Sequence, residues 1–236
     1  MNYFLFNLIF FKMKKVFKCL IFAVLFAATS VSVSADARFG ARLGLPISSV
    51  KVSEKNSSSS SSGSKVGFQV GILGELPIGE SFSFQPEFLF TQGGGTLKDK
   101  GGSGDYKWEE KNTFATGELQ IPLNFKYTHS LGSVKIFGLA GLYGSYIVSA
   151  EGKSEYTYDG ETEKETTDLL KKDGKGNRQV DQLEIGLNVA AGVELQNGLF
   201  IEAGYKHGFT NLATKDYDEE NVIKKSAFSI GVGFFF

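Results

Sequence analysis

The last nine residues of the chain, Phe228 to Phe236, read FSIGVGFFF, and large apolar side chains alternate in them with serine and glycine. Alternation with a period of two is the pattern of a β-strand that has one apolar face and one small or polar face. The chain is therefore predicted to end in a strand with one bulky face. The apolar positions of this strand are Phe228, Ile230, Val232, Phe234 and Phe236.

The same alternation recurs upstream. Four further segments show it strongly and three show it more weakly, which gives eight predicted strands of about ten residues each. All 29 glycines lie after residue 35, and this enrichment favours crowded strands and turns over helices. The strong segments are residues 65–72, 82–90, 119–127 and 182–195, and the weaker ones are residues 37–46, 134–149 and 199–210.

The connections between these segments alternate between long and short along the chain. An even number of strands, with short turns at one end and long loops at the other, is the layout of an outer-membrane barrel. The long connections are about 48–63, 93–112, 151–180 and 211–221, and the short ones are 77–80, 129–133 and 196–198. We expect the long ones to be loops, with the serine run Ser57–Ser62 flexible.

The direction in which the bulky face points decides between a membrane barrel and a soluble one. An eight-stranded barrel has room inside only for side chains, and here one face is rich in phenylalanine and tyrosine while the other is glycine, serine, glutamine, glutamate and lysine. The aromatic face must then point outward, which suits lipid and would expose a large apolar patch in water. The fold class predicted is all-β, an eight-stranded antiparallel up-and-down transmembrane β-barrel. A soluble ligand-binding barrel with its apolar faces inside is the alternative.

Residues 1–35 read as a secretory signal peptide. Three lysines in residues 14–18 precede an apolar run over Cys19–Ala28, and small residues follow up to Ala35. Cleavage is expected after Ala35, with Ala37 as the alternative. The barrel domain then spans residues 36–236, and export through the inner membrane leads it to the outer membrane.

Two other interpretations of the leader stay open. Met13 is an alternative translation start, because Met-Lys-Lys is a typical beginning of a signal. An uncleaved anchor over Val16–Val33 is long enough to span a bilayer, but serine and threonine from position 29 onward dilute it.

Charge and cysteine use exclude several functions. The leader holds four of the 25 basic residues and none of the 26 acidic ones, which leaves 21 against 26 and a formal net charge of −5 for the exported part. Bulk charge thus argues against nucleic-acid binding. The only cysteine is Cys19 in the leader, so the exported part has no thiolate for a disulfide or for metal binding.

Four stretches resemble the PorT-type family of small outer-membrane barrels. They are FQPEFLFTQG at Phe84–Gly93, ELQIPL at Glu118–Leu123, Gly192–Glu194 and Tyr205–Leu212. In that family the second stretch is usually Leu-Glu-Ile-Pro-Leu, so Gln120 stands here where the family has a glutamate. The resemblance covers the whole exported part and implies a plug-free barrel of a Gram-negative outer membrane. The family's namesake is tied to protein export and gliding, and most relatives have no assigned activity.

The face opposite the aromatic residues carries charges that a barrel would enclose. Buried charge has to be paired and hydrogen-bonded, so we expect a salt-bridge network that fills a closed lumen. A proton or ion path is the alternative interpretation. The candidate residues are Arg38, Arg42, Lys65, Glu75, Glu87, Lys126, Glu184, Glu194, Glu202 and Lys206.

No residue pattern predicts catalysis, a cofactor or a metal site. His207 is two residues from Tyr205 in the same predicted strand, so it shares the face of Tyr205 and is expected to point toward lipid. Ser226 or Ser145 could lie near it. His129 lies in a short turn. Such a serine and histidine could form a lipid-modifying acyl hydrolase, which is the alternative from the enzyme class. There is no pair of histidines at ligand spacing.

The function predicted is therefore a non-enzymatic barrel with a structural, surface-binding or export-associated role, with a narrow pore as a further alternative. The terminal Phe236 and its apolar partners resemble the signal by which outer-membrane barrels are recognised for insertion. The expected partners are the lipid bilayer, lipopolysaccharide and the barrel-assembly machinery, and the barrel is expected to be a monomer that binds no nucleic acid.

Overall fold

A computed structural model describes residues 37–54, 60–103, 106–158, 161–172, 178–214 and 221–236. The predicted leader, with Met13 and Cys19, lies outside the described residues. In the described ranges there is no helix of the length and hydropathy that a membrane span needs. The elements are β1 (Arg38–Glu54), β2 (Ser60–Val66), β3 (Gln69–Pro77), β4 (Phe82–Ser103), β5 (Tyr106–Leu131), β6 (Val134–Tyr158), β7 (Glu161–Asp168), β8 (Leu183–Leu195), β9 (Leu199–Gly208) and β10 (Asn221–Phe235).

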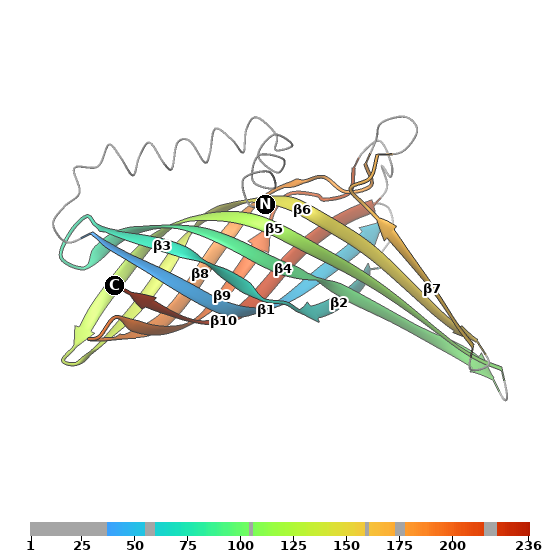
Figure 1. Cartoon of the computed structure of the whole chain (residues 1–236), viewed down its shortest axis with the longest axis horizontal. Helices are drawn as coiled ribbons and strands as arrows, with labels where there is room; N and C mark the ends of the chain where they lie inside the picture. The colour runs from blue at the N-terminus through green and yellow to red at the C-terminus, as the bar shows by residue number, and fades with distance from the viewer. Residues whose placement is uncertain (1–36, 55–59, 104–105, 159–160, 173–177, 215–220) are drawn as a thin grey trace, which may run out of the picture.

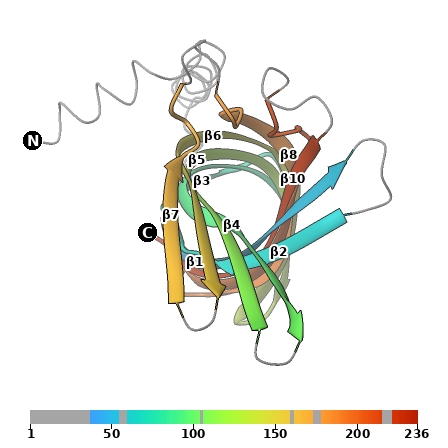
Figure 2. The ribbon, with the colours of Figure 1, turned by 90° about the vertical axis from the view of Figure 1, so that its right-hand side faces the viewer.

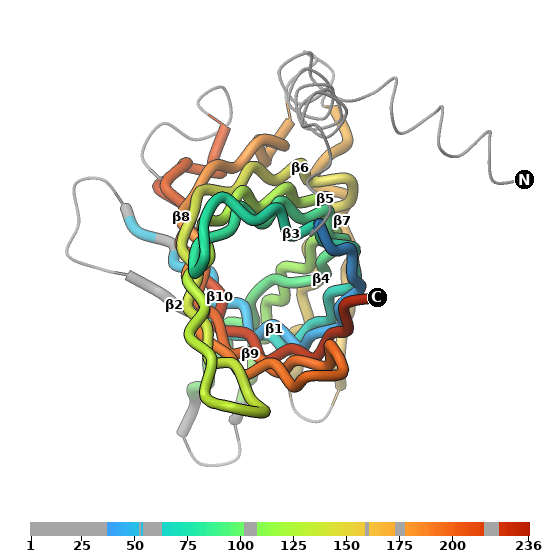
Figure 3. Tube along the Cα trace, turned by 90° about the vertical axis from the view of Figure 1, so that its left-hand side faces the viewer, coloured from blue at the N-terminus to red at the C-terminus, as the bar shows by residue number. Residues whose placement is uncertain are grey.

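Eight of these strands close into a ring. Figure 1 shows the barrel from the side, and Figure 3 shows it along its length. The ring runs β1, β3, β4, β5, β6, β8, β9 and β10, with each strand antiparallel to the next. It closes because β10 pairs with β1 from Gly40 opposite Phe235 to Glu54 opposite Asn221. The predicted eight-stranded, all-antiparallel barrel is confirmed.

The remaining two strands lengthen the wall beyond the ring. β2 pairs with β1, and β7 pairs with β6. Together with the outer half of the β4–β5 pair they form long hairpins, and Figure 2 looks onto the end from which these hairpins project. Because long connections of outer-membrane barrels lie on the extracellular side, this is the extracellular end.

The prediction that residues 48–63, 93–112 and 151–180 are loops is wrong over most of their described parts. β5 continues for 26 residues and β6 for 25, and the described serines Ser60–Ser62 belong to β2. The hairpins lack apolar alternation because water covers both faces, so opposite charges across the strands take its place. Lys111 and Glu155, for example, approach to 3.0 Å between β5 and β6.

The three short turns lie together at the other end, as predicted. They follow Pro77, Leu131 and Leu195, and the middle turn is shorter than expected because β5 continues to Leu131. Gly132 and Gly198 occupy positive φ angles of 67° and 88° in two of them, a conformation that glycine adopts without steric cost. β1 begins and β10 finishes at this end, which is therefore the periplasmic one.

The outer surface is apolar, and the interior is not purely polar. Large apolar side chains project outward from the ring, for example Ile72 and Phe125, each 62 % exposed. The expectation of a small and polar interior is wrong near the periplasmic end, where apolar side chains form a buried layer. Glycines leave room for it, because a Cβ at Gly233 would collide with the Phe200 ring. The layer consists of Leu73, Phe137, Leu139, Phe200 and Phe235.

Candidate functional site

The middle of the lumen is crossed by Arg42, which reaches from β1 to two opposite walls. Its Nη1 lies 3.0 Å from Oε2 of Glu87 on β4, and its Nη2 forms an ion pair with Glu202 on β9. The other oxygen of Glu87 accepts hydrogen bonds from Gln85 at 2.9 Å and Asn124 at 3.0 Å. All five side chains are buried, so this layer meets the requirement that enclosed charge be paired.

A second layer of charges lies nearer the periplasm. The ammonium of Lys126 on β5 is 2.8 Å from Glu75 on β3 and 3.4 Å from Glu194 on β8. Arg38 joins the same two carboxylates at 2.8 and 2.6 Å, and Lys135 approaches Glu194 to 3.4 Å from the rim. Three cations and two carboxylates thus close the periplasmic half of the lumen.

The aromatic layer lies against these cations. Nζ of Lys126 is 4.5 Å from the ring centroid of Phe137 and 4.9 Å from that of Phe235, and the guanidinium of Arg38 is 4.3 Å from Phe235. The Phe200 ring lies 5.2 Å from the Phe235 ring. Cation–π contacts of this kind are strongest where water is excluded, so the rings and charges form one packed block.

A third charged layer lies nearer the cell surface. Lys225 on β10 forms ion pairs with Glu118 on β5 and, at 2.8 Å, with Glu184 on β8. The hydroxyl of Tyr143 donates to Glu184 at 2.9 Å, and Ser145 donates to Glu118 at 2.9 Å. Every carboxylate of this layer is therefore held by a cation and a hydroxyl.

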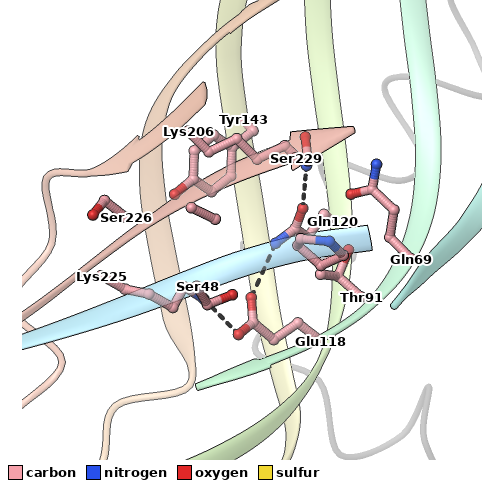
Figure 4. Close-up of a pocket in the computed structure, with 12 residues that line it drawn as sticks. Ser48, Gln69, Thr91, Glu118, Gln120, Tyr143, Lys206, Lys225, Ser226 and Ser229 are labelled. Carbon is pink, nitrogen blue, oxygen red and sulfur yellow. Dashed lines mark hydrogen bonds and ion pairs between the residues drawn. The ribbon is translucent and has the colours of Figure 1, made fainter. Parts of the chain in front are cut away.

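Next to this layer lies a small cavity of about 20 Å³, shown in Figure 4. Lys206, whose Nζ donates to Gln120 Oε1 at 2.6 Å, lines it and has no ion pair in the described part of the chain. The amide nitrogen of Gln69 and the hydroxyl of Thr91 also line the cavity and have no partner within the described residues. The volume suits one water molecule, which these donors would bind.

An apolar cluster lies at the extracellular end of the barrel. Ile147 and Ala150 of β6 pack with Val180 and Leu212, which come from the connections before β8 and after β9. Val180 forms a β-bridge with Ala213, and the amide of Leu212 donates to the Ile223 carbonyl at 2.9 Å. These bonds continue the wall of the barrel from β6 through the two connections to β10.

The structure brings together most residues of the predicted charge network, but not Lys65. That residue lies half-buried on β2, beyond the ring of eight strands, and forms no ion pair within the described residues. Nine of the ten candidates for the network lie in the three charged layers or beside the cavity: Arg38, Arg42, Glu75, Glu87, Lys126, Glu184, Glu194, Glu202 and Lys206.

Two members of the upper layer, Glu118 and Lys225, were missed by the sequence pattern. The last strand was expected to begin near Phe228, but it begins at Asn221 and so includes Lys225. Lys225 shares the odd parity of Ser229 and Gly231, which would have placed it inside. Glu118 likewise shares the parity of Gln120.

His207 lies on the face predicted from the strand pattern, whereas His129, expected in a short turn, belongs to β5. His207 stacks with Tyr205 at 6.4 Å and contacts Phe209 at 5.8 Å between ring centroids, on the outer face. Ser226 is its register partner on β10, whereas Ser145 points into the lumen. Nδ1 of His207 has no hydrogen-bond partner among the described residues, and no cluster of metal ligands occurs among them. His129 is exposed at the periplasmic end.

A closed antiparallel ring with an apolar exterior and an ion-paired interior defines the class of outer-membrane β-barrel proteins. The chain belongs to the family described as outer membrane protein beta-barrel domain, whose model matches residues 27–214. The outer membrane is accordingly its location. A comparison with curated proteins finds no match.

Solved barrels resemble the chain in fold. The attachment invasion locus protein Ail of Yersinia pestis is 12% identical, with 84% of this chain and 98% of that one covered and a TM-score of 0.31. Neisserial surface protein A is 17% identical, with coverage of 84% and 97% and a TM-score of 0.36. The outer membrane enzyme PagL is 13% identical, with coverage of 80% and 98% and a TM-score of 0.40.

Proposed function

We propose that the protein is a non-enzymatic, non-conducting barrel that presents its long hairpins at the cell surface, in a structural, binding or export-associated role. The observation that carries this proposal is the filling of the lumen by Arg42 and Lys225, which join opposite walls at two heights. An ion could pass only if these buried pairs separated. Breaking one buried pair by losing a partner costs about 3 to 5 kcal/mol.

The two ends of the lumen support the same function. The aromatic layer of Phe137, Phe200 and Phe235 fills the interior near the periplasmic end, and the apolar cluster around Leu212 lies at the extracellular end. Arg38 and Lys135 are partly exposed at the periplasmic rim, whereas Arg42, Glu87 and Glu202 in the middle of the lumen are buried. The part of the molecule that is free to meet a partner is therefore the projecting hairpins, and loops on a rigid scaffold often carry binding.

The PorT-type relationship and the remaining partners belong to this proposal. Glu87, the last residue of the Gln85–Glu87 motif, forms an ion pair with Arg42, so the motif serves to build the interior of the barrel. The proposal also includes an export-associated role and cleavage of the leader in a Gram-negative cell. It includes a monomeric barrel in contact with lipopolysaccharide. The assembly machinery would recognise the terminal Phe236 before insertion.

Conductance in planar bilayers tests the proposal. The wild-type barrel is expected to show no steady steps, whereas removal of the Arg42 and Lys225 side chains together by alanine substitution gives a leakier lumen and shows that the assay detects opening. Steady, reproducible steps from the wild-type barrel would refute a filled lumen and favour a narrow pore.

A second function, lipid acyl hydrolysis, is favoured by one observation: Ser226 and His207 are cross-strand neighbours on the lipid face. Directly opposed residues on antiparallel strands have Cβ atoms about 4.5 to 5.5 Å apart. The test is release of fatty acid from lipid A by the purified barrel. Activity lost in both Ser226→Ala and His207→Ala, and kept in the inward-facing Ser229→Ala, would establish the enzyme and overturn the non-enzymatic proposal.

A further inference from the structure

A second cavity lies between the walls of the projecting hairpins, next to the apolar cluster at the extracellular end. Its volume is about 180 Å³. Residues from β1, β2, β4, β5, β6 and β10 surround it, so the extended wall encloses it from several sides, at the end seen in Figure 2. The lining residues that matter here are Val50, Leu97, Phe114, Gly152, Ser154 and Ile223.

The lining of this cavity is mainly apolar. Val50, Leu97, Phe114 and Ile223 belong to it. Its polar members have partners. Lys153 forms an ion pair with Glu151 at 3.4 Å, and the Thr113 hydroxyl lies 3.4 Å from that of Thr96. Ser154 donates to Asn112 Oδ1 at 2.7 Å. The amide nitrogen of Asn112 in turn donates to Glu110 at 2.7 Å. An apolar cavity without unpaired polar groups holds water poorly.

The lining of the cavity is separate from the charged layers of the lumen. Phe114 and Ile223, which line the cavity, also pack against the apolar cluster of Ile147, Ala150 and Leu212. None of the lining residues belongs to the ion pair between Lys225 and Glu118 or to the other charged layers. This separation favours a binding site rather than part of a channel.

We propose that this cavity is a binding site for a small hydrophobic molecule of the size of one aromatic ring or a short alkyl chain. Apolar protein cavities of about 150 Å³ take up benzene, and this one is slightly larger. The inference rests on the proposed function, in which the hairpins bind and the lumen stays closed. It adds the class of ligand and the residues that contact it.

Gly152 offers a way to fill the cavity. A Cβ at Gly152 would meet only the flexible Leu169 side chain, at 3.4 Å, so Gly152→Leu adds volume without a backbone collision. At Gly95, by contrast, a Cβ would lie 2.6 Å from the carbonyl oxygen of Gly63. Ser149→Leu is the matched control, because Ser149 is exposed on the same strand and does not line the cavity.

The test is a toluene titration of the purified barrel in micelles, followed by NMR of its methyl groups. Saturable shifts are expected at the methyls of Val50, Leu97 and Ile223, and Gly152→Leu should weaken the apparent affinity at least tenfold while Ser149→Leu leaves it unchanged. Leu97→Ala, which enlarges the site, should extend binding to naphthalene and keeps the proposal testable if Gly152→Leu fails to fold.

Shifts that do not saturate, or that are equally large at the lipid-facing methyls of Ile72 and Ile230, would mean simple partition into the micelle and would overturn the site. Conductance separates this outcome from failure of the proposed function. A silent barrel that does not bind toluene refutes only the site, and a conducting barrel that binds it refutes only the closed lumen.

Discussion

The ammonium of Lys225 on β10 and the carboxylate of Glu118 on β5 form an ion pair, although the two strands lie on opposite sides of the ring. Glu184 shares the same ammonium, with its Oε2 2.8 Å from Nζ. One lysine thus ties three strands together across the full width of the lumen. Because all three side chains are buried, the loss of the cation would leave two carboxylates facing each other in a medium of low dielectric.

Lys225→Met is therefore expected to destabilise the barrel by about 3 to 5 kcal/mol, the cost of leaving buried charge uncompensated. Lys224→Met is the matched control, because Lys224 is the exposed neighbour on the same strand. The measurement is urea unfolding in lipid vesicles, together with the temperature at which the folded band is lost on gels. Equal stability of the two variants would contradict a structural role of the pair.

Depth in the bilayer should govern the cost of charge on the outer face. Phe88 and Phe82 are both exposed on β4, but Phe82 begins the strand at the periplasmic turn and Phe88 lies further along the wall. Phe88→Lys is expected to cost about 2 to 4 kcal/mol and Phe82→Lys about 0 to 1 kcal/mol. Unfolding in vesicles measures both, and the reverse order would show that the assignment of depth is wrong.

The outward face was predictable because alternation is strict where one side of a strand meets lipid. From Phe228 to Phe234 on β10, large apolar residues alternate with small inner residues, and every large side chain is exposed. The hairpins were not predictable by this criterion, since water covers both faces there and polar residues suffice. β7, for example, contains no apolar residue and still pairs with β6 along its whole length.

The interior was predictable in kind but not in its partners. Parity assigns Arg42 and Glu87 to the same side of their strands, yet only the register and closure of the ring bring them within 3.0 Å. Parity also assigns Phe137 and Phe200 to the inside, where the average composition suggested small residues. Their fit depends on glycines of neighbouring strands, such as Gly233 beside Phe200, which no single-strand pattern displays.

The two final phenylalanines should differ in what they do. Phe235 points inward onto Phe200 and Arg38, so Phe235→Ala is expected to cost about 3 to 5 kcal/mol of stability. Phe236 is 76 % exposed, and its amide donates a hydrogen bond to the Phe39 carbonyl at 2.9 Å. Deletion of Phe236 should therefore lower the amount inserted in cells and leave the stability of the refolded barrel nearly unchanged.

Heat shifts on gels of outer-membrane fractions measure insertion, and refolding into vesicles measures stability. Normal insertion of the chain that lacks Phe236 would show that this residue has no role in assembly.

The stability of the extracellular hairpins should decrease as the pH falls. The hydrogen bond and charge of Lys111 hold the pKa of Glu155 below its ordinary value. A lowered pKa in the folded state means that this pairing stabilises the hairpin above the ordinary pKa and is lost as the pH falls through the lowered one. Lys111→Met should raise the pKa of Glu155, measured by carbon NMR of its carboxyl group, whereas Lys51→Met on β1 should leave it unchanged.

Close packing of β5 against β6 depends on Gly141, where a Cβ would lie 2.7 Å from the Cα of Asn124 on β5. Gly141→Ala must push these two strands apart and is expected to cost about 1 to 3 kcal/mol, as for other overpacked sites. Gly138 lies on the same strand, and a Cβ there would meet nothing nearer than the Ala190 carbonyl at 4.0 Å. Gly138→Ala should therefore be nearly neutral in urea unfolding. If both variants lost the same stability, flexibility of the unfolded chain rather than strand spacing would explain the glycines of this wall.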